Sequence, residues 1–178
     1  MSNALAKLQI IGLEAGGTLN AQYNPKEIGI DKSVPWQKSP TSSGDQPELQ
    51  FTSAEGRSMS FELFFDEYES GGNVHAKYVE QLLTFARVMQ PTGPEDKRRP
   101  TRVRIAWGGG IPDFEGVIES VSTKYTMFLP SGVPCRCTCS VKVKEASRAS
   151  APKKQSGGAG GAGGSGGSGG SGGAGGGT

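Results

Sequence analysis

The sequence predicts a mainly β protein: a mostly antiparallel sheet that closes into a barrel, with one amphipathic helix packed on it. Three observations lead to this class. Residues 134–145, PCRCTCSVKVKE, alternate strictly between apolar and polar side chains, which is typical of a half-buried strand. Several other runs alternate in the same way and are joined by short turns, which favours antiparallel pairing and barrel closure. A single stretch, between Asn73 and Pro91, has helical periodicity instead.

The first half of the chain predicts four strands, separated by a glycine turn, an Asn-Pro break and a long loop. The expected strands are 5–13, 18–23, 27–36 (ending at Pro35) and 58–68. The pair Gly16-Gly17 suits a hairpin turn, and Asn24-Pro25 interrupts the chain before the third strand. Residues 35–49 are rich in Pro, Ser and Gly and are expected to form a loop.

The second half predicts the helix and three more strands. Asn73 is a suitable helix cap and Pro91 a suitable stop, and the apolar residues between them recur at three-and-four spacing. After a loop at 90–100, the expected strands are 101–107, 113–129 (bent at Gly116) and 134–145, with turns at 108–110 and 130–133.

The row of three cysteines decides whether the last strand carries chemistry. On a strand, Cys135, Cys137, Cys139, Val141 and Val143 share one face. Same-face neighbours lie about 6.6 Å apart, whereas a disulfide needs Cβ atoms about 3.8 Å apart. Zinc needs four converging ligands, and the chain has three cysteines and one histidine. We therefore expect this row to be one wall of the core, with a redox role and a metal site as alternatives.

Composition limits the folded part to one domain. Residues 1–146 are expected to form the barrel, and residues 147–178 a flexible Gly/Ala/Ser-rich tail. The net charge of +2 gives no general attraction to nucleic acid or acidic membranes. No apolar run approaches 18 residues and no signal peptide is recognisable, so we expect cytoplasmic production without membrane insertion.

No catalytic or cofactor-binding motif stands out. The segment WGGGIP (107–112) lacks the following helix that a phosphate loop needs. The acidic run DEYE (66–69) lacks the spacing of a calcium loop. His75 has no nucleophile tied to it by a known motif, and a surface or capping role is expected. The basic run KRRPTRVR (97–104) predicts a solvated face or a charged contact with a neighbouring protein. We expect no enzyme and no cofactor.

Three segments together resemble the tube-protein domain of contractile injection systems, the phage-tail-like particles that drive a rigid inner tube through a contracting sheath. These segments are YNPKEIGIDKSVPW (23–36), QPELQFTSAEGRSMSFELFFDEYE (46–69) and FEGVIESVSTKYTMFLPSGVPCRCTCSVKVKE (114–145). The resemblance covers roughly Lys7 to Glu145. It implies a tube-like β-barrel with one packed helix, assembled as a six-fold ring. The implied place of that ring is the tube initiator, between the spike hub and the repeating inner tube.

The same resemblance implies the partners: further copies, the inner-tube protein, the spike or hub protein and baseplate proteins. It also implies assembly in the cytoplasm into a particle that is released or docked at a membrane. Many family members continue into a LysM module, which this sequence does not show after residue 147, so no LysM role is carried over.

Competing functions remain open at this stage. A repeating tube or terminator subunit would use the same barrel, and a small ligand-binding barrel would need a cavity. Candidate interface residues are Asn24, Pro25, Trp36, Arg98 and Arg99. Trp36, beside Pro35 in a polar stretch, is either a core plug or an interface anchor.

Overall fold

The computed structural model describes residues 5–39 and 48–146. Seven strands form one sheet in the order β2-β1-β7-β8-β9-β6-β3, and β4 and β5 form a separate ribbon. All pairings between these strands are antiparallel. The strands are β1 (Gln9–Gly12), β2 (Thr18–Asn20), β3 (Ile28–Asp31), β4 (Trp36–Lys38), β5 (Leu49–Phe51), β6 (Ser58–Asp66), β7 (Arg102–Ala106), β8 (Phe114–Phe128) and β9 (Pro134–Glu145). The helical segments are the π-helical η1 (His75–Val79), α1 (Glu80–Ala86) and the 3-10 helix η2 (Glu95–Lys97).

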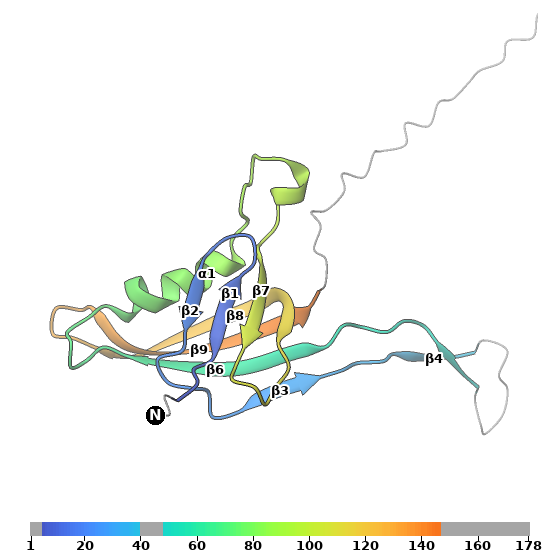
Figure 1. Ribbon diagram of the computed structural model, residues 1–178, viewed down its shortest axis with the longest axis horizontal. Helices are drawn as coiled ribbons and strands as arrows, with labels where there is room; N and C mark the ends of the chain where they lie inside the picture. The colour runs from blue at the N-terminus through green and yellow to red at the C-terminus, as the bar shows by residue number, and fades with distance from the viewer. Residues whose placement is uncertain (1–4, 40–47, 147–178) are drawn as a thin grey trace, which may run out of the picture.

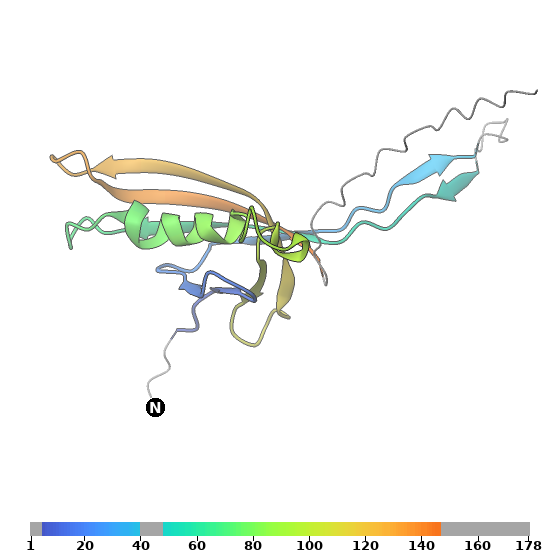
Figure 2. The ribbon, with the colours of Figure 1, turned by 90° about the horizontal axis from the view of Figure 1, so that it is seen from above.

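The sheet curls around the helix. Figure 2 shows β8 and β9 on one side of α1 and the first two strands on the other. Gln81 Nε2 donates to the carbonyl of Thr18 at 3.0 Å, which ties the helix to the β1–β2 hairpin. The predicted class, a mostly antiparallel sheet with one helix, is confirmed. The predicted barrel closure is wrong for the described part of a single chain, because no pairing there joins β2 to β3 and the sheet stays open.

Strand β8 connects the two parts of the curled sheet, with β7, β1 and β2 on one side of it and β9, β6 and β3 on the other. Its first residues, 114–117, pair with β7, and 116–128 pair with β9. Gly116 lies where both neighbours are present, and a Cβ there would lie 2.2 Å from the carbonyl oxygen of Lys144. Only glycine allows β9 to approach this closely. The irregularity that follows, between Ile118 and Ser120, adds the local bend that a bulge produces.

The helix begins at the expected cap and ends early. Asn73 Oδ1 accepts from the backbone N–H of His75 at 2.9 Å and of Ala76 at 3.3 Å, which satisfies amides that the first turn leaves free. The helix was expected to run to Pro91, but the chain becomes extended at Arg87. There the backbone turns to pair with 97–100, where the N–H of Met89 donates to the carbonyl of Arg99 at 3.0 Å. Non-local pairing thus ends the helix before the proline does.

Between β3 and β6 the chain leaves the sheet as a long projection, which we call the arm (residues 32–39 and 48–57). Figures 1 and 2 show it extending away from the body along the strand direction. The expected loop at 35–49 is only partly correct, because Trp36–Lys38 pairs with Leu49–Phe51 to form the ribbon. The expected third strand also ends at Asp31 rather than at Pro35. The expected tail at 147–178 lies outside the described residues.

Candidate functional site: assembly surfaces

The cysteine row lies inside the core. Cys135, Cys137, Cys139 and Val143 are fully buried, and Val141 is 2% exposed. All three thiols are free, and a hydrogen bond to Cys139, together with burial, raises the pKa of the Cys137 thiol. The described residues contain no cluster of three or more His, Cys, Asp or Glu side chains that could hold a metal ion. These thiols therefore pack as small apolar side chains.

A buried carboxylate joins the end of β6 to the start of the helix. Glu67 is 7% exposed, and its oxygens accept from Lys77 Nζ at 2.7 Å, Tyr78 Oη at 2.7 Å and Ser70 Oγ at 2.6 Å. The hydrogen bond from Lys77 leads these contacts in lowering the pKa of Glu67 to about 2. The neighbouring Asp66 pairs with Arg136 at 2.6 Å. The acidic run at 66–69 is thus used for internal pairing.

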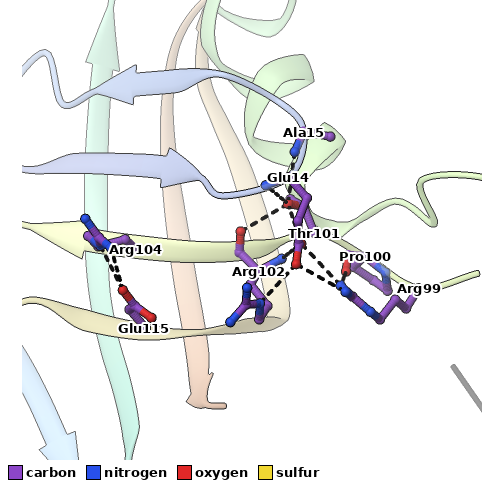
Figure 3. A network of polar contacts seen from close by, with 8 residues as sticks. All are labelled: Glu14, Ala15, Arg99, Pro100, Thr101, Arg102, Arg104 and Glu115. Carbon is purple, nitrogen blue, oxygen red and sulfur yellow. Dashed lines mark hydrogen bonds and ion pairs between the residues drawn. The ribbon is translucent and has the colours of Figure 1, made fainter. Parts of the chain in front are cut away.

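A second carboxylate, Glu14, fastens the β1–β2 turn to the start of β7 (Figure 3). It accepts from Arg99 at 3.1 Å, from Arg102 Nε at 3.0 Å and from the Arg102 backbone N–H at 2.7 Å. The Thr101 hydroxyl accepts the backbone N–H groups of Glu14 and Ala15, both at 3.2 Å. Burial opposes ionisation of Glu14, but the bonds from Arg99, Arg102 and Thr101 outweigh it and hold the pKa at about 2.

This network decides what the basic run at 97–104 can do. The Arg99 side chain is 14% exposed and is paired with Glu14, so most of it is used within the chain, and its role at an interface stays a prediction. Arg104 is paired with Glu115 at 2.7 Å, and Figure 3 shows this pair beside the Glu14 cluster. Arg98 is exposed and donates to the carbonyl of Gly93 at 2.8 Å. Of the two arginine candidates, Arg98 is the more exposed.

The Asn-Pro break at 24–25 is a structural junction. Asn24 Oδ1 accepts from the backbone N–H of Leu8 at 3.0 Å, and its Nδ2 donates to the carbonyl of Ala6 at 2.8 Å. Pro25 is buried. These contacts hold the segment before β1 against the chain leading into β3. The surface beside them belongs to Tyr23, which the sequence did not single out.

Tyr23 forms a groove with Phe64 of β6. The two exposed rings lie 5.5 Å apart at a tilt of 53°. The groove encloses about 700 Å³ and is lined by the segment from Tyr23 to Glu27 together with Glu62, Phe64 and Thr138. We call it the Tyr23–Phe64 groove. Both rings are partly covered by cations, with Lys7 over Tyr23 at 6.0 Å and Arg136 over Phe64 at 5.9 Å.

The arm carries an uncovered apolar face. Trp36 pairs with Phe51 and Lys38 with Leu49 across the ribbon, so these four side chains share one face, and Gln37 and Gln50 share the other. Trp36, Phe51 and Leu49 are 55%, 53% and 57% exposed. The interpretation of Trp36 as a core plug is therefore wrong, and the interface alternative stays open.

Several strands of the described body have a side without a strand partner; β2, at one end of the sheet, pairs only with β1, and β3 and β8 offer the longer free edges. β3 pairs only with β6, through all four of its residues. β8 pairs with β7 through residues 114–117, and in the described structure no strand flanks the outer side of residues 118–128. Both edges present backbone N–H and C=O groups that another strand can use.

None of the described helices is long and apolar enough to cross a membrane. A search of curated proteins found no match. A family model described as contractile injection system tube protein matches residues 4–154, which is most of the chain. The match spans the curled sheet, the helix and the arm, and the chain therefore belongs to the contractile injection system tube protein family.

Proposed function

We propose that six copies of this protein close into a ring at the initiating end of the inner tube and join the spike hub to the repeating tube. Membership of the tube family supports a structural role in the tube. The six-fold symmetry and the initiator position rest on the resemblance of the sequence segments, and no catalytic step is part of the proposal.

The single observation that carries ring formation is the pair of free edges on β3 and β8. Along β8, β9, β6 and β3 each strand runs opposite to the one before, so β3 runs opposite to β8. A copy related by rotation about an axis along the strands would offer its β8 edge to β3 in antiparallel orientation. This is a head-to-tail contact that closes into a ring.

A repeating or terminating tube subunit is the second candidate, and one observation favours it. Exposed apolar side chains lie beyond both ends of β6. The arm leaves beside Ser58 at one end, and Tyr68 and Phe128, 56% and 55% exposed, follow Asp66 and Met127 at the other. A subunit stacked above and below by like rings would use both ends. A ligand-binding barrel is less favoured, because the interior between sheet and helix is filled by a continuous apolar core.

Proline substitution on β3 tests the ring. Backbone N–H groups alternate between the two sides of a strand. Ile30 and Asp31 are consecutive residues of β3, so the amide of one bonds to β6 and the amide of the other faces outward. Proline at each position removes that amide. We expect the outward variant to keep the melting temperature but lose the ring, seen by electron microscopy and sedimentation. Its neighbour is the matched control, since it should mainly lower the melting temperature.

Electron microscopy of the wild-type protein separates the two candidates. An initiator gives isolated rings that grow only when inner-tube protein is added, whereas a repeating subunit grows into tubes alone. A chain that stays monomeric at high concentration, and also fails to join tube subunits, contradicts both.

A further inference from the structure

The two faces of the ribbon in the arm differ in polarity, and the apolar face stays exposed in the single chain. One face of the ribbon carries Trp36, Phe51, Leu49 and Lys38, and the other carries two glutamines. The rings of Trp36 and Phe51 lie 5.6 Å apart, edge to face, yet both remain more than half exposed. A lone two-stranded ribbon is at best marginally stable in water. Covering this face would therefore stabilise the ribbon as well as bind a partner.

The Tyr23–Phe64 groove has the complementary chemistry. It offers two exposed aromatic rings, and Glu27 and Glu62 stand at its border. The nearest lysine across the ladder from Glu62 is Lys142, which pairs with Glu119 at 3.0 Å. No described residue forms an ion pair with Glu62, so its carboxylate can take a cation from outside.

The spacing of aromatic and charge is the same on both surfaces. On the arm, Lys38 follows Trp36 by two residues, and in the groove Glu62 precedes Phe64 by two. Each charge therefore lies roughly 6.6 Å along the strand from its aromatic neighbour, on the same face. An indole placed against the groove rings would bring the ammonium of Lys38 to the carboxylate of Glu62.

The arm cannot reach the groove of its own chain. It leaves the sheet beside Asp31 and Ser58, which pair at one end of β6, whereas Phe64 lies six residues further along that strand. That is roughly 20 Å in the direction opposite to the arm, and Figure 1 shows β4 beyond the far end of the body. The arm can therefore reach such a groove only on another molecule.

We propose that the arm of one copy docks on a second copy, with Trp36 and Phe51 against the Tyr23–Phe64 groove and Lys38 paired with Glu62. This contact deepens the second candidate function, the repeating subunit, and rests on it. Copies in one ring are related by rotation about an axis along the strands, so their grooves lie at the same height and the arm can reach only a copy in a stacked ring. In this contact the packing of aromatic rings supplies most of the binding energy. The charge pair fixes how the arm is aligned along the groove.

Disulfide trapping tests this contact without replacing its aromatic or charged residues. Leu49 is the cross-strand neighbour of Lys38 and lies on the same, apolar face of the ribbon. Thr138 is the cross-strand neighbour of Phe64 and lines the groove. The double variant Leu49→Cys with Thr138→Cys should give covalent multimers in assembled tubes, where rings are stacked, under mild oxidation. The matched control is Gln50→Cys with Thr138→Cys, one residue away on the other face, which should cross-link at least tenfold less. The wild-type thiols are buried and give the background.

Assembly midpoints supply the second arm of the test. Trp36→Ala should raise the concentration needed for tube assembly tenfold or more, as expected for an interface anchor. Lys38→Glu and Glu62→Lys should each raise it roughly two- to fivefold, and the combined variant should restore it.

The outcomes separate the docking from the ring. Tubes that form with no face-specific cross-link, or at an unchanged midpoint in Trp36→Ala, overturn the docking and leave the stacking of rings intact. A wild-type chain that forms only isolated rings also overturns the docking and leaves the ring intact. Equal cross-linking from both faces of the ribbon also overturns it. A wild-type chain that forms neither ring nor tube overturns the proposed function, and the docking with it.

Discussion

The body and the arm of this protein treat apolar and charged side chains in opposite ways. In the body, the inward-facing apolar residues of β6, β9 and the helix are sealed inside, and the carboxylates of Glu14 and Glu67 are bonded to several donors. In the arm, tryptophan, phenylalanine and leucine face outward. The difference indicates that the body carries the stability of the single chain, whereas the arm is completed by association.

The largest expected difference in stability between a buried and an exposed position lies at two adjacent phenylalanines of β6. Phe65 is fully buried and stacks on Tyr78 with ring centroids 4.4 Å apart, so Phe65→Ala should cost about 3–5 kcal/mol of unfolding free energy. Phe64 is 37% exposed on the other face, and Phe64→Ala should cost less than about 1 kcal/mol. Urea denaturation followed by circular dichroism measures both, and equal losses would contradict the assignment of the two faces.

The next largest effect on stability is expected for the buried ion cluster around Glu67. Glu67→Gln should lower the unfolding free energy by about 1–3 kcal/mol at pH 7, because three donors lose a charged acceptor. The pKa of Glu67 is lowered from 4.5 to about 2 in the folded state. Its contribution is therefore complete above pH 4.5 and is lost as the pH falls toward 2.

Unfolding curves at several pH values check this sign. The difference between wild type and Glu67→Gln should shrink on acidification through that window. The exposed neighbour variant Glu69→Gln should show little difference at any of these pH values. A gap that widens toward acid would refute the role given to Glu67.

The smallest expected effect on stability is that of replacing Trp36 in the arm. Trp36→Ser should change the unfolding free energy of the body by less than about 0.5 kcal/mol, because the substituted side chain is exposed on the projection. With Trp36 removed, Trp107, which donates to the carbonyl of Ala6 at 3.1 Å, is the sole tryptophan and reports on the body by fluorescence. A loss as large as that of Phe65→Ala would show that the arm supports the body.

Local sequence patterns predicted the helix cap, the turns and the approximate positions of the strands in the body. Period-two alternation over 134–145 indicated a buried cysteine face, and that face is buried in the structure. The cap at Asn73 and the turn glycines also acted through neighbours close in sequence. Gly16, with φ of 91°, is an example, because the turn needs a backbone conformation that glycine adopts without strain.

Long-range pairings were beyond those patterns. Glu14 lies 85 residues before Arg99, so the basic run resembled a free patch until its partner was placed. The ribbon was missed because Pro, Ser and Gly dominate 35–49, and strand formation there depends on the Trp36–Phe51 pairing. The Tyr23–Phe64 groove joins a residue before β3 to one late in β6. Both residues lie in segments that carry the family resemblance, but nothing local in either segment shows that the two rings meet. Barrel closure was expected within one chain because the strand pattern does not show where the partner of an edge comes from.

The open sheet also bears on ring size. In the proposed ring, each copy contributes four strands, β8, β9, β6 and β3, counted from one joining edge to the other. Because four is even, each added copy preserves the alternation of strand polarity, so five, six or seven copies would all join without a mismatched seam. Strand direction therefore leaves the number of copies undetermined. The stoichiometry would instead follow from curvature, and the bend of β8 after Gly116 is one place where a substitution could yield a wider or narrower bore.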